Sequence, residues 1–307
     1  MTWNPDRIPD QTGRTIAVTG ATAGIGYFAA EQLARAGANV VLASRSADKL
    51  EVAQATLRLQ VPGASLESVV IDMTSLDSIA RASDALAATP RLEGILLNAG
   101  VMTAVSGAKT VDGLPVMMAS HAIGNFALVS RLLPALAHAS EGSYARIVHT
   151  STGFVRRFRM SVDNLTHTPW PSIAAYTQAK TATEVYAFEL DRRLRAAGLP
   201  VSSLVTHPGV GVDAKTPLRP GIRDATTPYQ RNPYTPWAQG KDAAAWSAVR
   251  ALTDPSATGG EYYAPREGIR GLPVSIAPLP RTAAPEPGVS AGVWEQLERL
   301  SGTHVLA

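Results

Sequence analysis

The sequence contains no cysteine, which excludes disulfides, thiolate nucleophiles and Cys-ligated metal sites. Excess charge of one sign is also scarce, since the formal net charge is only +3 and the densest basic cluster, residues 154–160, is short. We interpret this cluster as a solvated loop and expect no nucleic-acid partner. No apolar run reaches eighteen residues, and the first residues lack an apolar core of signal-peptide length. We therefore expect a cytoplasmic protein with no membrane span.

The 307 residues, 45% of them hydrophobic, are enough to bury a substantial core. Short apolar strands alternate with segments of helical periodicity. The strands read as continuous apolar runs, which is typical of a parallel sheet covered by helices on both faces. We expect strands over residues 14–20, 38–44, 66–73, 94–100, 146–151, 199–209 and 259–265. We expect helices ending at 36 and spanning 48–60, 75–88, 114–139, 174–197, 241–252 and 293–300. The pattern predicts a single α/β domain over 1–307 with a doubly wound parallel sheet.

A proline-rich segment follows the strand that ends near His207. It carries Pro208, Pro217, Pro220, Pro228, Pro233 and Pro236. Long loops of this kind in a compact domain are usually functional, so we predict a substrate lid over about 212–240, followed by a C-terminal extension over about 270–307. Three aromatic residues in the lid, Tyr229, Tyr234 and Trp237, favour a lipophilic or ring-containing substrate.

A glycine-rich turn joins the first strand to the first helix. Glycines permit positive φ and close approach to a ligand, and the helix N-terminus offers free N–H groups to a pyrophosphate. The spacing is TGxxxGxG, and a purely structural turn is the alternative interpretation. In the first βαβ unit, the turn predicts a Rossmann-like dinucleotide site contacted by Gly20, Thr22, Ala23, Gly24, Ile25 and Gly26.

The second strand ends in Ser44 and Arg45, where a site for NAD usually carries an acidic residue. A guanidinium and a hydroxyl suit a 2′-phosphate, so we expect NADP in preference to NAD. The alternative is a surface arginine before a helix. Asp72, which ends the third strand beside Met73, either caps the following segment or contacts adenine.

Tyr176 and Lys180 lie four residues apart on one face of a predicted helix. This spacing alone is a weak signal, but its place in an ordered series of motifs is specific. The whole series resembles the short-chain dehydrogenase/reductase family, and its C-terminal part resembles the retinol-dehydrogenase-like branch. The resemblance rests on residues 19–26, 98–100 (NAG), 146–152, the YxxxK pattern and 208–209 (PG).

The resemblance implies an NADP(H)-dependent enzyme that interconverts a carbonyl and an alcohol. Tyr176 would be its acid/base, and Lys180 would lower the pKa of the phenol and hold the nicotinamide ribose. A homodimer or homotetramer is also implied. The groove for the cofactor would include Asn98, Ala99, Gly100, Pro208, Gly209 and Val210.

Three positions depart from the family pattern. The usual Ser-Ser pair is Ser151-Thr152 here, which favours Thr152 as the catalytic hydroxyl with Ser151 as the alternative. Ser120 takes the place of an Asn that orders a relay water, while the nearby Asn125 is interpreted as structural. Asp213 stands where relatives often have a Thr near the nicotinamide amide, and it either faces the cofactor or caps a helix.

Two other functions stay open. A relative that binds NADP(H) without efficient catalysis, acting as a sensor or scaffold, would account for Ser120 and Thr152. Epimerisation or dehydration of a nucleotide sugar is a further alternative, although such relatives have larger C-terminal domains. His121, His149 and His207 lack metal-site spacing, so no metal is predicted.

Overall fold

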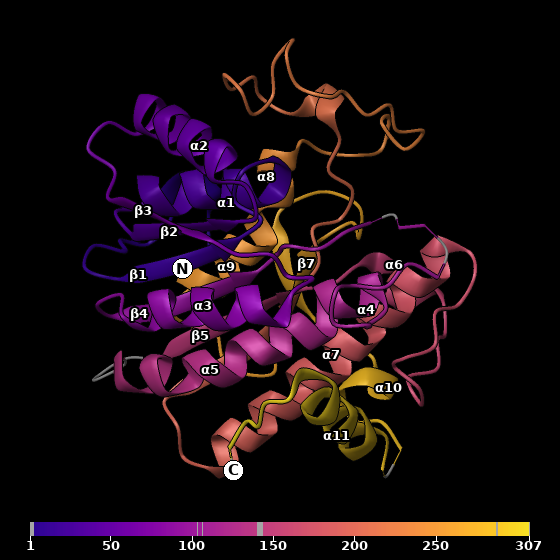
Figure 1. Ribbon diagram of the computed structural model, residues 1–307. Helices are drawn as coiled ribbons and strands as arrows, with labels where there is room; N and C mark the ends of the chain where they lie inside the picture. The colour runs from indigo at the N-terminus through magenta and orange to yellow at the C-terminus, as the bar shows by residue number, and fades with distance from the viewer. Residues whose placement is uncertain (1–2, 103, 106, 140–143, 287, 307) are drawn as a thin grey trace.

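The computed structural model describes residues 3–102, 104–105, 107–139, 144–286 and 288–306. Their strands form one sheet in the order β3-β2-β1-β4-β5-β6-β7-β8 (Figure 1). All neighbouring strands are parallel except β7 and β8, which are antiparallel. The predicted Rossmann-like, doubly wound α/β fold is confirmed.

The strands are β1 (Thr15–Thr19), β2 (Asn39–Ser44), β3 (Leu66–Val70), β4 (Leu92–Leu97), β5 (Ala145–Thr150), β6 (Val201–Thr206), β7 (Tyr262–Pro265) and β8 (Pro273–Ile276). The α-helices are α1 (Gly24–Arg35), α2 (Ala47–Gln60), α3 (Leu76–Ala87), α4 (Val116–Met118), α5 (Gly124–Ala139), α6 (Gly153–Arg157), α7 (Ser172–Ala196), α8 (Lys241–Ala244), α9 (Trp246–Thr253), α10 (Pro280–Ala283) and α11 (Val289–Ser301). Two short 3₁₀ turns, η1 (Pro5–Arg7) and η3 (Asp213–Lys215), and a π-helical turn, η2 (Ala119–Ile123), complete the elements.

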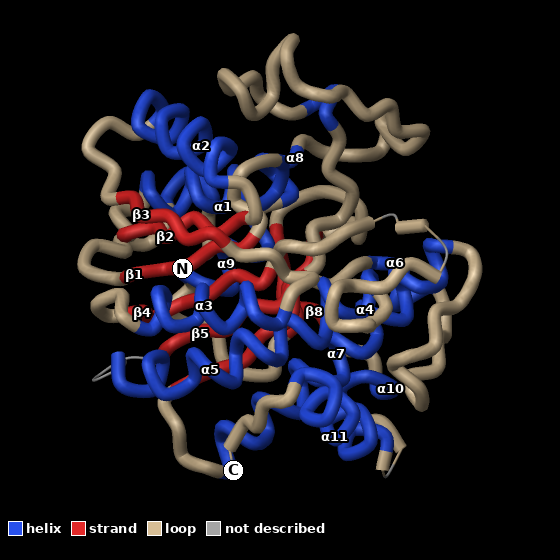
Figure 2. The backbone as a smooth tube through the Cα atoms, viewed as in Figure 1, coloured by secondary structure: helices blue, strands red, loops and turns tan. Residues whose placement is uncertain are grey.

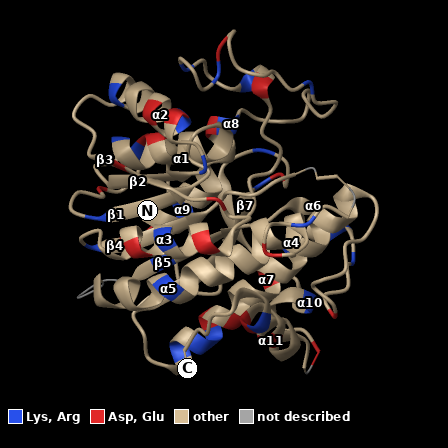
Figure 3. Cartoon of the chain, viewed as in Figure 1, with Lys and Arg blue, Asp and Glu red and all other residues tan. Residues whose placement is uncertain are grey.

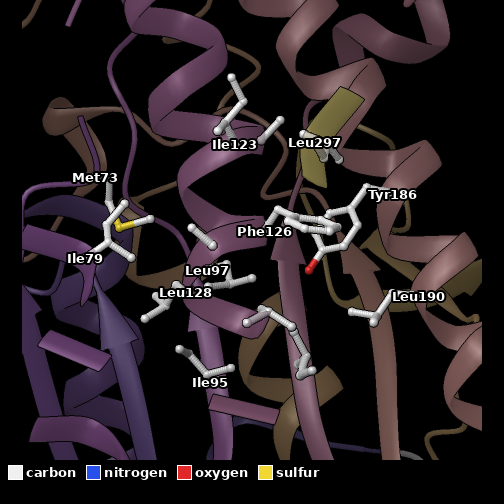
Figure 4. Packing of buried hydrophobic residues seen from close by; sticks show 14 of the residues in the cluster. Met73, Ile79, Ile95, Leu97, Ile123, Phe126, Leu128, Tyr186, Leu190 and Leu297 are labelled. Atoms are coloured by element: carbon white, nitrogen blue, oxygen red, sulfur yellow. The ribbon is translucent and has the colours of Figure 1, made fainter. Parts of the chain in front are cut away.

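Helices cover both faces of the sheet, as the continuous apolar strands require. Figure 2 shows the strands between the two helical layers. The core on one face joins the sheet to α3, α5, α7 and α11, and Figure 4 shows its Met73, Ile79, Phe126 and Tyr186 packed together. The core on the other face joins it to α1, α2 and α9. Because the parallel strands share one direction, the carboxyl ends of β1, β4 and β5 meet at one edge, where such sheets bind ligands.

One long helical stretch, Val116–Ala139, is long and apolar enough to cross a membrane by length and composition, with a mean hydropathy of 1.3. It comprises α4, η2 and α5, and 83% of its most apolar window is buried inside the fold. Packing between α3, α7 and the sheet therefore accounts for its composition.

Several local expectations needed correction. The predicted helix over 241–252 is two helices, α8 and α9. The strand expected over 66–73 ends at Val70, because Asp72 turns the chain through a hydrogen bond from the Thr74 amide. Helices α6 and α10 and the edge strand β8 were not predicted, because each has only four or five residues and lacks a full period of apolar positions.

The proline-rich segment docks on the side of the molecule that carries the glycine-rich turn. Arg219 forms a bidentate ion pair with Glu31 of α1, at 2.8 Å for both contacts, and Thr56 of α2 donates to the Pro220 carbonyl at 2.7 Å. Figure 2 shows the segment as a long loop near α2 and α8. Its Tyr229, Tyr234 and Trp237 are exposed. These contacts place part of the segment against α1 and α2, and its role as a substrate lid stays a prediction.

Candidate active site

Tyr176 and Lys180 both lie on α7 and are buried, as their shared helical face predicts. The Lys180 Nζ lies 5.9 Å from the centroid of the Tyr176 ring and donates to the Thr150 carbonyl at 2.5 Å. Since Thr150 ends β5, this bond fixes the lysine at the carboxyl edge of the sheet. Charged side chains are otherwise scattered and mixed in sign over the ribbon (Figure 3).

The protonation of this pair differs from the expectation. Burial raises the pKa of the Tyr176 phenol to about 12, and a hydrogen bond with Thr152 acts in the opposite direction. Burial also lowers the pKa of Lys180 to about 7, against the opposing charge of Glu184. Burial therefore favours the neutral form of the Lys180 amine. In the protein without cofactor, its charge does not bring the phenol below its usual pKa, because desolvation dominates both groups.

The structure separates the two candidate hydroxyls. Thr152 follows the end of β5 as the N-cap of α6, and its hydroxyl lies near enough to Tyr176 to lower the pKa of the phenol. Ser151 is buried and donates to the Glu184 carboxylate at 2.5 Å. The two side chains diverge because successive residues of an extended chain face opposite ways. The structure thus places Thr152 near the tyrosine and Ser151 on Glu184, and Thr152 as the catalytic hydroxyl stays a prediction.

The central helix also differs from the expectation. Ser120 is buried and donates to its own helix at the Met117 carbonyl, 3.3 Å away. His121, the next residue in the π-helical turn, packs edge-on against the Tyr176 ring at 5.2 Å between centroids. The expected position of Ser120 beside the catalytic groups therefore belongs to His121. Asn125 donates to the His121 carbonyl at 2.7 Å, which agrees with its structural interpretation.

The glycine-rich turn leaves the start of α1 open. Gly20 and Gly24 have φ of +70° and +54°. A Cβ at Gly26 would lie 2.3 Å from the Gly20 carbonyl oxygen, so the turn closes tightly on itself. The N-cap, Ala23, supplies no side-chain hydrogen bond to the first amides of α1. These uncapped amides are donors suited to a diphosphate.

The end of β2 offers a second set of donors. The Thr22 and Ser44 hydroxyls lie 3.1 Å apart, while Arg45 is exposed and has no hydrogen bond or ion pair among the described residues. Asp72 accepts from the Thr74 amide and hydroxyl, which supports the capping interpretation. Met73 packs its side chain in the core, so as a cofactor residue it could offer only its backbone.

The end of β4 is held by β1. Thr19 receives hydrogen bonds on its hydroxyl oxygen from the amides of Asn98 and Ala99, both at 3.0 Å. Asn98 also donates its side-chain amide to the Thr19 carbonyl. A Cβ at Gly100 would lie 1.9 Å from the His121 ring, so this glycine admits the histidine. The NAG segment thus shapes the edge of the sheet and positions His121.

The segment after β6 is tied to neighbouring loops. Gly209 has a φ of +68° and accommodates the Ile269 carbonyl, 2.3 Å from where its Cβ would stand, next to Pro208. The Val210 amide donates to Ile269 and its carbonyl accepts from Gln239. The cofactor contact expected of Val210 could therefore involve only its side chain. The expected helix-cap role of Asp213 is not seen, because its carboxylate pairs with Lys241 at 2.6 Å.

Two charged residues escaped the prediction from sequence. Glu184 is buried one turn after Lys180, where burial raises its pKa, and it accepts from Ser151 and from Tyr262 at 2.9 Å. Its place four residues after Lys180 was the available signal. Lys241 carried no signal, since its neighbour Asp213 is 28 residues away in the chain. Among the described residues, no cluster of His, Asp and Glu could hold a metal.

Comparison with known proteins identifies the family. The sequence model of the short chain dehydrogenase family matches residues 14–222. The chain belongs to this family, as the motifs predicted. Mouse polyprenol dehydrogenase is 36% identical over 212 residues, a match that covers 68% of this chain and 63% of the relative. Human retinol dehydrogenase 13 is 33% identical over 219 residues, covering 70% and 63%. These relatives agree with the predicted retinol-dehydrogenase-like branch.

Solved structures show the same architecture. A crystal structure of an uncharacterised protein from Mycobacterium paratuberculosis aligns over the whole of both chains, with a TM-score of 0.79 and 27% identity. L-Sorbose reductase from Gluconobacter frateurii, solved with NADPH and L-sorbose, aligns over 85% of this chain and 97% of its own. Its TM-score is 0.63 at 16% identity, a likeness of fold.

Proposed function

We propose that this protein interconverts a carbonyl and an alcohol with NADP(H). The observation that carries the proposal is the placement of Thr152 near Tyr176, beside Lys180 at the edge of the sheet where the glycine-rich turn opens. A proton donor, a neutral hydroxyl and the Lys180 amine are thereby placed near one another. Family membership supports the same chemistry.

The residues divide the work of carbonyl reduction. Bound NADPH supplies the hydride. Tyr176 gives its phenolic proton to the carbonyl oxygen as negative charge develops there, and Thr152 donates a hydrogen bond to the same oxygen. Lys180 stabilises the resulting phenolate when it is protonated. The uncapped start of α1 and the hydroxyls of Thr22 and Ser44 fit the phosphates and ribose of a dinucleotide.

A preference for NADP over NAD is part of the proposal. Arg45 supports it, because its guanidinium is exposed and unpaired in the described part of the chain, directly after the strand that carries Ser44. We expect Arg45→Met to lower the affinity for NADPH at least about tenfold and to change the affinity for NADH about twofold or less. The reason is that the charge-assisted bidentate bond forms only with the 2′-phosphate, which NADH lacks. Fluorescence titration of both cofactors checks this.

We propose that the substrate is lipophilic, because the surface near Tyr176 carries aromatic and apolar side chains. Phe154 lies 6.5 Å from the Tyr176 ring and 6.1 Å from Phe158, between ring centroids. A small, open hollow lies next to Ala175 and is lined by Ala104, Val105, Met117 and Pro169. Several apolar side chains in the chain segments that carry these residues are exposed: Met102, Val105, Phe158, Trp170 and Ile173. Polyprenol and retinol, named in the relatives, are apolar alcohols.

Replacement of Tyr176 by Phe tests the reaction. We expect NADPH consumption with a panel of aliphatic and ring-containing aldehydes and ketones to fall by at least about a thousandfold, because the proton donor is lost. NADPH affinity should stay within about twofold, since the cofactor donors are elsewhere. A variant with wild-type turnover would contradict the assignment of Tyr176. A wild type that binds NADPH but turns over no member of the panel would favour the sensor or scaffold alternative.

Homodimer or homotetramer formation stays a prediction. Helix α11 packs on α5 and α7 through Trp294, which lies 5.2 Å from Phe126 between ring centroids. This contact covers part of the two long helices, α5 and α7, through which relatives of this family often pair. We therefore propose that any pairing of this chain includes α11. Cytoplasmic localisation is likewise a proposal.

A further inference from the structure

The ion pair between Lys241 and Asp213 stands at the mouth of the glycine-rich turn. The Lys241 Nζ lies 2.6 Å from Asp213 Oδ1. Its side-chain stem crosses the turn, since a Cβ at Gly24 would lie 3.6 Å from Lys241 Cδ. Gly24 is also the first residue of α1, whose leading amides have no side-chain cap. A cation and open amide donors therefore share one place.

The backbone of Lys241 is fixed from three sides. Its amide donates to the Thr216 hydroxyl at 2.9 Å, and that hydroxyl donates to the Val212 carbonyl. On the α1 side, Gln32 donates to the Asp242 carbonyl at 2.9 Å. A Cβ at Gly211 would approach Lys241 Cα to 3.3 Å, so the neighbouring chain packs closely against it. The anchor leaves only the side chain of Lys241 free to change partner.

The two members of the pair differ in exposure. The Asp213 side chain is 4% exposed, while that of Lys241 is 25% exposed. Asp213 keeps further contacts without Lys241, because its Oδ2 accepts from the Gln230 amide at 3.0 Å and Arg223 lies 4.0 Å from Oδ1. The carboxylate is thus held by the lid segment, and the lysine is the partner that can turn toward a ligand.

We propose that Lys241 binds the diphosphate of the dinucleotide, and that Asp213 holds the lysine beside the glycine-rich turn until the cofactor enters. This inference rests on the proposed use of NADP(H) and adds a residue from outside the family motifs. The diphosphate replaces one anionic partner of Lys241 by another of higher charge. Residues 212–240 then act as a clasp on the cofactor side of the molecule, where Arg219 already binds Glu31.

The test compares two fragments of NADP, each tied to one part of the site. ADP-ribose carries the diphosphate without the 2′-phosphate, and adenosine 2′-monophosphate carries the 2′-phosphate without the diphosphate. We expect Lys241→Met to lower the affinity for ADP-ribose about tenfold or more, because a charge-assisted hydrogen bond is lost. Isothermal titration measures this affinity. The same variant should change the affinity for adenosine 2′-monophosphate by about twofold or less. Lys241→Arg should keep most of the affinity, and Arg45→Met should show the reverse selectivity.

Asp213→Asn separates binding from a merely structural ion pair. If Lys241 binds the diphosphate, removing the competing carboxylate should raise the affinity for ADP-ribose by about threefold, whereas Lys241→Met should lower that affinity. A hinge contact alone would make both variants weaken binding alike, and that result would overturn the inference.

Lys215→Met is the matched control. Lys215 lies in the segment 212–240 that leads to Lys241, and its ammonium donates to the Pro236 and Ala238 carbonyls, at 3.3 and 2.8 Å. An effect of Lys241→Met no larger than that of Lys215→Met would also overturn the inference. Failure of the wild type to bind either fragment would contradict the proposed function itself.

Discussion

At the scale of the residue, the catalytic pair is governed by burial. Tyr176 and Lys180 both lose solvent, and each pKa moves in the direction that favours the neutral form. Only Thr152 opposes this for the phenol, and only the charge of Glu184 opposes it for the lysine. The site is thus a neutral acid beside a weakly basic amine until a charged ligand enters.

Lys180→Met should raise the stability of the cofactor-free protein in a pH-dependent way. The pKa of Lys180 falls from 10.5 to about 7 on folding, so between these values the unfolded chain holds more protons and stability rises with pH. The cost of burying Lys180 is full below about pH 7 and absent above about 10.5. Urea unfolding should therefore show a gain for the variant near pH 6 that shrinks toward pH 10. A difference that does not change with pH would contradict the buried charge.

Thr152→Val and Ser151→Ala should differ in what they impair. Loss of the Thr152 hydroxyl removes a donor to the developing oxyanion, so kcat should fall about a hundredfold. Stability should fall by about 0.5–2 kcal/mol, because the same hydroxyl caps α6. Ser151→Ala leaves the buried Glu184 short of one donor and should cost about 1–3 kcal/mol of stability, with kcat falling less than about tenfold. Steady-state kinetics and urea unfolding of both variants check this, and the opposite pattern would make Ser151 the catalytic hydroxyl.

At the scale of the element, the glycine-rich turn shows what a sequence motif can and cannot predict. The spacing of Gly20, Gly24 and Gly26 predicted the turn and the start of α1. It could not predict that Gly26 is required by the Gly20 carbonyl, because that contact depends on the closed path of the backbone.

Gly26→Ala should destabilise the protein by about 1–3 kcal/mol, since a rigid carbonyl lies 2.3 Å from the added Cβ. Gly26→Ala should also lower the affinity for NADPH. Gly292→Ala is the control, because this α11 glycine has open space around it and the alanine should stabilise the helix by about 0.5–1 kcal/mol. Thermal unfolding with and without NADPH measures both. Equal effects of the two substitutions would contradict the tight turn.

The central helix illustrates a failure of alignment by residue type. Ser120 was placed in the site because it precedes His121 as an Asn precedes a His in relatives. His121, within the π-helical turn Ala119–Ile123, packs against Tyr176 instead. Residue type alone did not distinguish two neighbouring positions of this helix.

At the scale of the whole molecule, the predicted fold follows from the alternation of apolar strands and helices, which any sequence with this pattern reveals. Contacts between distant segments do not follow from this alternation. The docking of residues 212–240 on α1 depends on Arg219 meeting Glu31 across 188 positions, and no local pattern encodes that meeting. The substrate lid was predicted from proline content alone, which indicates a loop but not the surface it covers.

The C-terminal extension is part of the core. Trp294 is buried, packs on Phe126, and lies 3.9 Å below the guanidinium carbon of Arg193. Trp294→Ala should lower the free energy of unfolding by about 3–5 kcal/mol. Trp237→Ala, at an exposed position of the lid segment, should change it by less than about 0.5 kcal/mol. Urea unfolding of the two variants measures both changes. If Trp294→Ala left the free energy of unfolding unchanged, the extension would not be part of the core.

The central claim is hydride transfer from NADPH to a carbonyl, with Tyr176 as proton donor. Mass spectrometry of the product formed from NADPH deuterated at both C4 positions tests it most directly. The account predicts an alcohol carrying one deuterium on the former carbonyl carbon with the wild type, and a loss of that product with Tyr176→Phe although NADPH still binds. An alcohol without deuterium, or labelled product formed equally by Tyr176→Phe, would contradict it.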